Sequence, residues 1–463
     1  MRTTIAALLL LLAIPAFAQD RVDIAARRII DAEVGTTRAY DTLEYLTDNI
    51  GPRLSGSPNA ERAVRWATEQ FRRWGIPVTN EKVMVPHWVR GAERGSLVSH
   101  NQQRVILTAL GGSVATPAAG LTAEVVEVTS YDQLEQLGTK GVQGKIVFYN
   151  RPMNMELVRS GRAFDAYSDA VQFRGGGASR AAQYGAVASV VRSVASASLR
   201  TPHTGAMRYD PKFKKIPAAA IATEDADLIH RLVAKGERVR MHLLLTPRTL
   251  PDVASANVIA EIRGSERPDE IVLVGGHLDS WDLGTGAIDN GSGVVMVMET
   301  MRLLHELGIK PRRTIRAVLF MNEENGLRGA RAYFANRAET ELHKHVAAIE
   351  TDAGAAKPTG FITTLHGVQL TRFEARASVL NAIAKMSYSS SQQTGADTSP
   401  LTDAGVPGFG LIPEPLHYFD YHHSAADTLD KIDPRELSQS TAAVAALTYI
   451  LADSDFDPRQ TAN

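Results

Sequence analysis

The sequence predicts an α/β fold: a mostly parallel mixed sheet covered by helices on both faces, with a second, smaller α/β domain inserted into it. From residue 252 onward, short apolar runs alternate with amphipathic helical stretches. These runs are almost continuously apolar, which is typical of parallel strands buried on both faces. Between about residues 115 and 245, a separate set of short strands and helices follows the linker GGSVATPAAG, which indicates a domain of its own.

The first 18 residues have the pattern of a secretory signal peptide. MRTTIAALLLLLAIPAFA combines one arginine, an apolar stretch and a small-x-small end at Ala16 to Ala18. The apolar stretch is shorter than the roughly 20 residues that span a bilayer. We therefore expect cleavage near Ala18 and a secreted or periplasmic protein with no membrane partner.

The composition excludes several classes of protein. The chain has no cysteine, which excludes disulfides and thiolate metal sites. Its 50 basic and 51 acidic residues are balanced, which argues against a nucleic acid or an anionic membrane as partner. An exported chain without cysteine fits a bacterial periplasm or medium. Its length allows two or three domains with substantial cores.

Two helical stretches are predicted before the inserted domain. Residues 21–49 read as helical. The next helix starts with Ser57 as N-cap and Pro58 in the first turn, and ends at Gly75. Its buried face carries apolar residues at helical spacing: Ala63, Ala67, Phe71 and Trp74.

We divide the chain into a signal peptide (1–18), a discontinuous main domain (19–115 and 246–463) and an inserted domain (116–245). Strands are predicted in the insert at AEVVEV, KIVFYN, AVASVVRSV and VRMHLLL, and helices at GASRAAQYG and EDADLIHRLVAKG. The insert contains no cluster of metal-ligand residues. Its isolated His203 and His230 are expected to have structural or surface roles.

Three predicted strands of the main domain end in polar side chains. IVLVGG precedes His277, TIRAVLFMN precedes Glu323, and HVAAIET precedes Asp352. Ligands of open α/β sheets bind beyond the carboxyl ends of the strands. We therefore expect these side chains to meet at one edge of the sheet.

The residue types at these strand ends are those of a metal site. His277 offers an imidazole nitrogen, and Asp279 is placed to accept the other ring N–H and fix the tautomer. Asp289 lies in a glycine-rich turn and has two oxygens with which to bridge two cations. Asp352 offers a further oxygen ligand. Nitrogen and oxygen ligands of this kind suit zinc, with cobalt or manganese as alternatives.

The adjacent carboxylates Glu323 and Glu324 point in different directions from a strand end. One can bind a metal ion while the other acts as general base. A metal ion lowers the pKa of bound water from 15.7 toward about 7, so hydrolysis needs no serine or cysteine nucleophile. Late in the chain, YHHSAADT adds His422 and His423 as candidate ligands.

Four segments resemble the metal motifs of the co-catalytic di-zinc exopeptidases of the aminopeptidase Y type. They are GGHLDSWDLGTGAIDNGSG, NEENGLRGA, ETDAG and HHSAADT. The resemblance extends over almost the whole mature chain through IGPRLSGS and VPHWVRG, and RGGGASRAAQYGAVASVVRSV in the insert resembles a protease-associated domain. It implies a zinc-dependent exopeptidase that hydrolyses dipeptides or short peptides with free termini. It also allows a homodimer.

The resemblance implies a ligand set for two Zn²⁺ ions. His277 and Asp352 would hold one ion, and Glu324 and His423 the other. Asp289 would bridge the two ions. The family also implies a cis peptide bond directly after the bridging aspartate.

The resemblance also implies two catalytic roles. Glu323 would be the general acid and base, and Asp279 would orient His277. His423 is preferred to His422 as the ligand, because HSAADT fits the family's His-Ser/Thr-x-x-Asp-Thr pattern only when it is aligned on His423.

Three alternative functions stay open. They are a strict aminopeptidase acting on longer peptides, a glutaminyl cyclase with a single zinc ion, and a non-catalytic binding protein on the same fold. The complete ligand set and the insert favour hydrolysis. Asp397, Tyr418 and Tyr421 either line the pocket or have structural roles.

Overall fold

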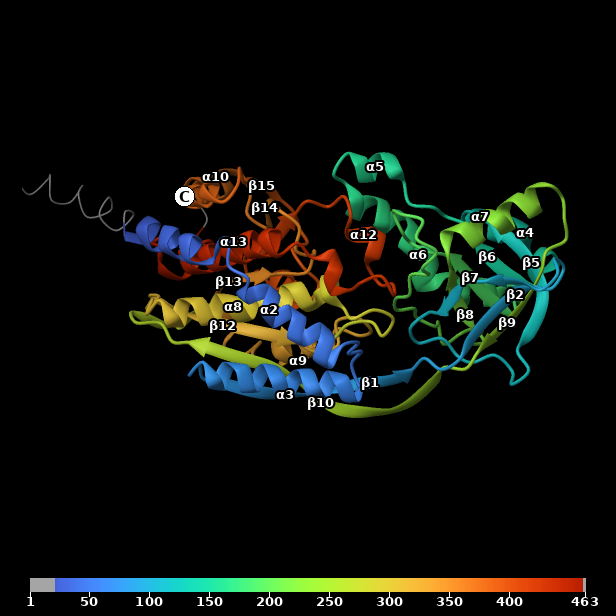
Figure 1. The fold of residues 1–463 in the computed structure, drawn as a ribbon, viewed down its shortest axis with the longest axis horizontal. Helices are drawn as coiled ribbons and strands as arrows, with labels where there is room; N and C mark the ends of the chain where they lie inside the picture. The colour runs from blue at the N-terminus through green and yellow to red at the C-terminus, as the bar shows by residue number, and fades with distance from the viewer. Residues whose placement is uncertain (1–20, 461–463) are drawn as a thin grey trace, which may run out of the picture.

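The computed structural model describes residues 21–460, so the predicted signal peptide lies outside the described residues. These residues form two α/β units that lie end to end, each built on an eight-stranded sheet (Figure 1). The main unit carries both ends of the described chain. The second unit lies between strands β1 and β10, which pair antiparallel and connect the two units. No helix among residues 21–460 is long and apolar enough to cross a membrane.

The sheet of the main unit has the order β1-β10-β12-β11-β13-β16-β14-β15. Its strands are β1 (Val78–Val89), β10 (Arg248–Ile262), β11 (Arg267–His277), β12 (Arg313–Phe320), β13 (His345–Glu350), β14 (Pro358–Thr363), β15 (Ser387–Ser390) and β16 (Gly408–Pro413). The central strands β12, β11, β13 and β16 run parallel, while β1 and β10 pair antiparallel with their neighbours. Strand β14 pairs antiparallel with β16 and parallel with β15. The predicted mixed sheet is therefore present.

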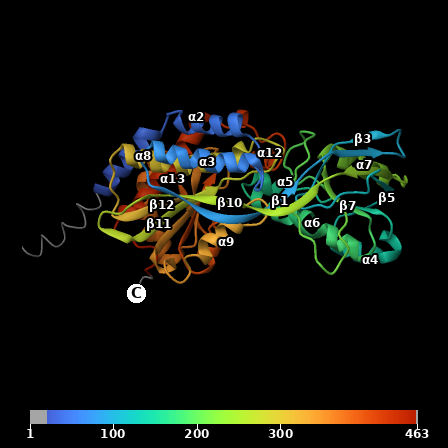
Figure 2. The same ribbon diagram turned by 90° about the horizontal axis from the view of Figure 1, so that it is seen from below.

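Helices cover both faces of this sheet (Figure 2). On one face lie a helix over residues 21–33, α2 (Arg38–Glu44), α3 (Pro58–Arg73), α8 (Ser292–Glu306) and α13 (Pro434–Asp453). On the other face lie α9 (Arg328–Ala335) and α11 (Ser399–Asp403). Alternation along β11 explains the two layers, because Val272 and Val274 pack in the first core and Leu273 in the second. Helix α10 (Gly367–Arg376) packs against β15, the edge strand of the sheet.

The N-terminal helices agree with the sequence pattern. The stretch predicted over 21–49 forms the helix over 21–33, α2 and a π-helical turn, η1 (Tyr45–Ile50). The Ser57 hydroxyl caps α3 by accepting a hydrogen bond from the Ala60 N–H at 3.1 Å. Phe71 is fully buried, as its position on the apolar face predicts.

The sheet of the second unit has the order β3-β2-β9-β5-β6-β7-β8-β4. Its strands are β2 (Glu93–Leu97), β3 (Gln103–Val105), β4 (Leu107–Ala109), β5 (Leu121–Val128), β6 (Ile146–Tyr149), β7 (Ala188–Arg192), β8 (Ala218–Ile221) and β9 (Arg240–Leu245). Its helices are α4 (Tyr131–Val142), α5 (Met155–Arg159), α6 (Ala163–Gln183) and α7 (Thr223–Ala234). The predicted strands and helices of the insert are all represented.

The second sheet starts earlier than the predicted boundary at residue 116. Strands β2, β3 and β4 all precede that residue and join the sheet by antiparallel pairing with β9, with β2 and with β8. All three are short, and the sequence of β2, ERGSL, is not apolar, so no apolar run marks the start of the second unit. Only pairing with strands far along the chain places them in the second unit.

Candidate metal centre

The predicted site residues lie at the carboxyl ends of three adjacent parallel strands. His277 is the last residue of β11, Glu323 and Glu324 follow β12, and Asp352 follows β13. Strand β11 pairs in parallel with β12 on one side and β13 on the other. The sheet therefore brings together side chains that are separated by up to 75 positions in the sequence.

Asp289 lies at the centre of the site. It sits in the turn η2 (Ala287–Gly291) that leads into α8, and the peptide bond from Asp289 to Asn290 is cis, as expected. Its Oδ1 lies 3.1 Å from Nε2 of His277, and its Oδ2 lies 3.1 Å from Nε2 of His423. Each carboxylate oxygen thus faces a different imidazole, which is the arrangement that a bridging ligand requires.

Each of these histidines is paired with a second carboxylate. Nε2 of His277 lies 3.3 Å from Oδ1 of Asp352, and Nε2 of His423 lies 3.0 Å from Oε2 of Glu324. The five predicted ligands therefore form two sets that share Asp289.

Two of the predicted ligand atoms support a cation site. Nε2 of His277 and Oδ1 of Asp352 are buried 3.3 Å apart, yet neither makes a hydrogen bond of good geometry among the described residues. Buried polar atoms of proteins are otherwise almost always hydrogen-bonded, so such atoms call for an explanation. Neutral imidazole nitrogens and carboxylate oxygens are the ligands that zinc takes in catalytic sites. The residues present therefore fit the predicted metal.

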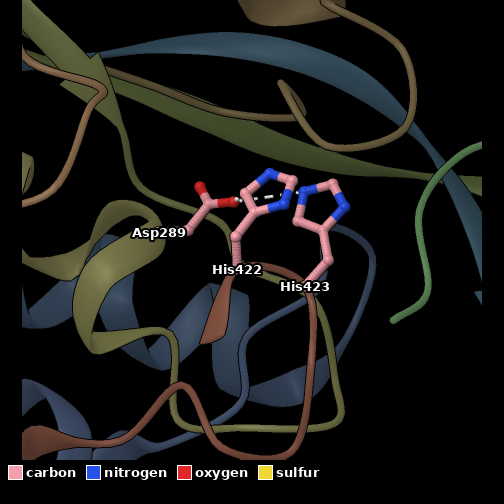
Figure 3. A group of neighbouring side chains, drawn as sticks. All are labelled: Asp289, His422 and His423. Atoms are coloured by element: carbon pink, nitrogen blue, oxygen red, sulfur yellow. Dashed lines mark ion pairs between the residues drawn. The ribbon is translucent and has the colours of Figure 1, made fainter. Parts of the chain in front are cut away.

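Both late histidines face Asp289 (Figure 3). The rings of His422 and His423 stack with centroids 3.6 Å apart, and Nε2 of His422 lies 3.3 Å from Oδ2 of Asp289. Among the described ion pairs, only His423 of the two also reaches Glu324. Geometry thus favours His423 as the histidine that completes the second ligand set.

Asp279 contacts both His277 and the Glu323 segment, although not in the predicted way. Nδ1 of His277 lies 3.0 Å from the main-chain carbonyl of Asp279 and 3.8 Å from its carboxylate. That carboxylate instead accepts hydrogen bonds from the N–H groups of Asn322 and Glu323, at 2.8 and 3.1 Å. Asp279 therefore contacts the imidazole through its backbone and the segment of the candidate base through its side chain.

Glu323 is half-buried beside the predicted ligands. Burial, together with the negative charges of Asp352 and Glu324, raises the pKa of Glu323 well above its ordinary value. A carboxyl group whose pKa is raised toward the working pH is suited to take up and release a proton. This is the behaviour expected of a general base.

Comparisons with known proteins agree with this geometry. Residues 257–448 match the model of peptidase family M28. The chain is 38% identical over 439 residues to carboxypeptidase Q of Homo sapiens, which covers 93% of this chain and 89% of that protein. The chain belongs to peptidase family M28. The predicted family resemblance is therefore confirmed, and the likeness to carboxypeptidase Q extends over most of the chain.

Solved structures show the same fold. The crystal structure of a peptidase M28 precursor from Shewanella amazonensis superposes with a TM-score of 0.90 at 37% identity, covering 95% of this chain and 98% of that one. A zinc aminopeptidase from Bacillus subtilis shares the fold with a TM-score of 0.67 at 22% identity, covering 91% and 96%. Both structures match across the two units.

In this M28 peptidase, two buried charges that sequence reasoning missed hold the loop that carries Asp289. The guanidinium of Arg53 donates to the carbonyls of Leu278, Thr285 and Gly286, at 2.6, 2.8 and 2.9 Å. The carboxylate of Asp427 accepts from the N–H groups of Ile288 and Asp289, at 2.7 and 3.1 Å. Burial raises the pKa of Asp427 to about 7. Both residues lie within quoted motifs, IGPRLSGS and HSAADT, which was the only signal available.

The remaining candidates have different positions in the M28 site. Asp397 is buried, and its two carboxylate oxygens have no hydrogen-bond partner among the described residues. Tyr418 and Tyr421 line a cavity of about 200 Å³ that also touches Ile288 and Ala353. These last two residues adjoin the predicted ligands Asp289 and Asp352 in the chain, so the cavity lies beside the candidate centre.

Proposed function

We propose that this M28 peptidase is an exported, zinc-dependent exopeptidase that hydrolyses dipeptides or short peptides with free termini. One observation carries the proposal: Asp289 faces His277 and His423 with different oxygens, and each histidine has its own carboxylate partner. Such a shared carboxylate suits two cations. The similarity to carboxypeptidase Q supports the exopeptidase assignment, and the N-terminal pattern supports export. We assign the second unit as a protease-associated domain.

The proposed centre holds two Zn²⁺ ions, for which Co²⁺ or Mn²⁺ can substitute. His277 and Asp352 would hold one ion, Glu324 and His423 the other, and Asp289 both. Bound zinc would supply Lewis acidity toward the peptide carbonyl and lower the pKa of water at the site.

Glu323 would be the general acid and base of the reaction. Its carboxylate takes the proton of the attacking water and delivers it to the amine that leaves. Asp279 supports this role by holding the Glu323 N–H at 3.1 Å. The cavity lined by Tyr418 and Tyr421 is where we expect a peptide side chain to lie.

A digest of a mixed peptide library with added zinc, read by mass spectrometry, tests the function. We expect single residues to be released from the ends of short peptides, with loss of activity on chelation and recovery on addition of zinc. The end that is shortened decides between aminopeptidase and carboxypeptidase. Peptides with an N-terminal glutamine test the cyclase alternative, because cyclisation releases ammonia without cleavage. Cleavage only at internal bonds, or none, would contradict the proposal.

The two late histidines give a matched test of the ligand set. In His423→Ala we expect the zinc content to fall by one ion per chain, because His423 is the histidine that reaches Glu324, at 3.0 Å. In His422→Ala we expect both ions to remain. Elemental analysis of gel-filtered protein gives the counts. If His422→Ala lost one ion and His423→Ala kept both, His422 would be the ligand instead.

A further inference from the structure

The second unit makes direct contact with one of the proposed metal ligands. Thr204 lies in the loop between β7 and β8, and its N–H donates to the carbonyl of His423 at 2.8 Å. The Thr204 carbonyl in turn lies 3.3 Å from Nδ1 of His423. His423 has a φ of 60°, a left-handed conformation that is unfavourable for a residue other than glycine. Such a conformation persists only where its surroundings hold it, and Thr204 supplies two of the contacts that do so.

Arg174 of helix α6 fixes this contact. Its Nη1 donates to the Thr204 carbonyl at 3.2 Å and lies 3.3 Å from Nδ1 of His423. Its Nη2 donates to the hydroxyl of Tyr167 at 2.7 Å. A side chain at Gly205 would collide with the guanidinium, so this position must be glycine for Arg174 to lie where it does. The arginine is buried against the ligand and the loop at the same time.

The second unit also positions Glu324, the other ligand of the same proposed ion. The N–H of Trp281 donates to Oε1 of Glu324 at 3.1 Å. The indole of Trp281 is buried in the core of the second unit, where it lies on Gly111. The next residue, Asp282, forms a two-point ion pair with Arg90 at 2.6 and 2.9 Å. The main-chain segment that holds Glu324 is thus anchored in the second unit.

The other ligand set has no such link. Within residues 21–460, the hydrogen bonds and ion pairs of His277 and Asp352 all stay in the main unit. Their places are set by the ends of β11 and β13 in the central sheet. The two halves of the proposed metal centre therefore differ in what holds them.

We propose that the second unit is the positioning element for one half of the metal centre, acting through Thr204 and Arg174 on His423 and through Trp281 on Glu324. The inference rests on the proposed function. An imidazole that binds a metal through Nε2 carries its proton on Nδ1, and a hydrogen-bond acceptor there fixes the ring and supports binding. The Thr204 carbonyl is that acceptor, and Arg174 is a positioning residue that directs it.

Replacing Arg174 by alanine tests the proposal in the full-length protein. We expect Arg174→Ala to bind the first zinc ion normally and the second about 10- to 100-fold more weakly, the usual effect of losing an outer contact to a metal ligand. Zinc per chain after gel filtration and titration against a competing chelator give the two affinities. Reconstitution with Co²⁺ adds a visible spectrum that reports the geometry of the second ion.

Three further variants separate positioning from general damage. Arg174→Lys keeps a donor for the Thr204 carbonyl and should recover part of the affinity. Gly205→Ala keeps the arginine but displaces it, and should weaken the second ion in the same way. The control is Arg180→Ala, which removes an exposed arginine from the same helix and should bind zinc as the wild type does. Thermal unfolding in chelator shows that each variant is folded.

The possible outcomes are distinct. The proposal is overturned if Arg174→Ala and Gly205→Ala bind both ions with wild-type affinity, or if both ions weaken equally. If Arg174→Ala does not fold, Gly205→Ala alone decides. A wild-type protein that binds no zinc would contradict the proposed function itself, whichever way the variants behave.

Discussion

Replacing Glu323 by glutamine is expected to lower kcat by a factor of about 10² to 10⁴ while both metal ions stay bound. Glutamine keeps the shape of the side chain but cannot take a proton from water. The Glu323 carboxylate is not part of either ligand set, and its N–H remains held by Asp279 in the variant. The turnover of an unblocked dipeptide checks the loss of activity. The zinc content of the same preparation checks that both metal ions stay bound.

The neighbouring residue supplies the control for that experiment. Glu324→Gln is the same chemical change one position along the chain, but Oε2 of Glu324 lies 3.0 Å from Nε2 of His423. We expect this variant to lose the ion that the two residues share. If Glu323→Gln lost zinc and Glu324→Gln kept it, the assignments of base and ligand would have to be exchanged. Near-normal turnover in Glu323→Gln would remove it from catalysis altogether.

The sequence predicts where three of the site residues meet because each of them follows a local signal. An almost continuous apolar run ends at His277, Glu323 and Asp352, and neighbouring parallel strands must end at the same edge of a sheet. The order of the strands in the sheet did not have to be known to predict that these residues lie at one edge. The signals for Asp289 and His423 are different, since each lies in a loop, and there the family motif supplied what periodicity does not.

Most of the site contacts that could not be predicted from the sequence are made by main-chain groups. Thr204 acts on His423 through its carbonyl and N–H, groups that every residue type except proline carries, so no residue pattern marks it. Arg53 likewise binds three carbonyls and has no charged partner among its hydrogen bonds in the described chain. Asp279 was predicted to act through its carboxylate, yet its carbonyl is the group nearest to His277. Contacts of this kind depend on loop conformation, which residue type alone does not determine.

The second large effect is expected from Asp289→Asn, which should leave no more than one zinc ion per chain. Asp289 is the only described side chain that faces both His277 and His423, one with each carboxylate oxygen. Asparagine has the same shape but replaces one of these oxygens by an amide nitrogen that carries two protons and cannot bind a cation. The bridging charge is lost as well. Turnover should fall at least as far as in Glu323→Gln, because here the metal centre itself is incomplete.

Stabilisation by zinc distinguishes this loss from unfolding. Free zinc at about 100 times the Kd of a site stabilises the folded protein by about 2.7 kcal/mol. The wild type should therefore show the contribution of both sites in denaturant unfolding. The zinc-dependent part should be smaller in Asp289→Asn, and comparison with each variant's own metal-free form cancels other effects of the substitution. Asp269→Asn makes the same change at an exposed position paired with Lys344, and should keep the full zinc effect. An undiminished zinc effect in Asp289→Asn would mean that the two histidines do not share a ligand, and the two-ion centre would fail with it.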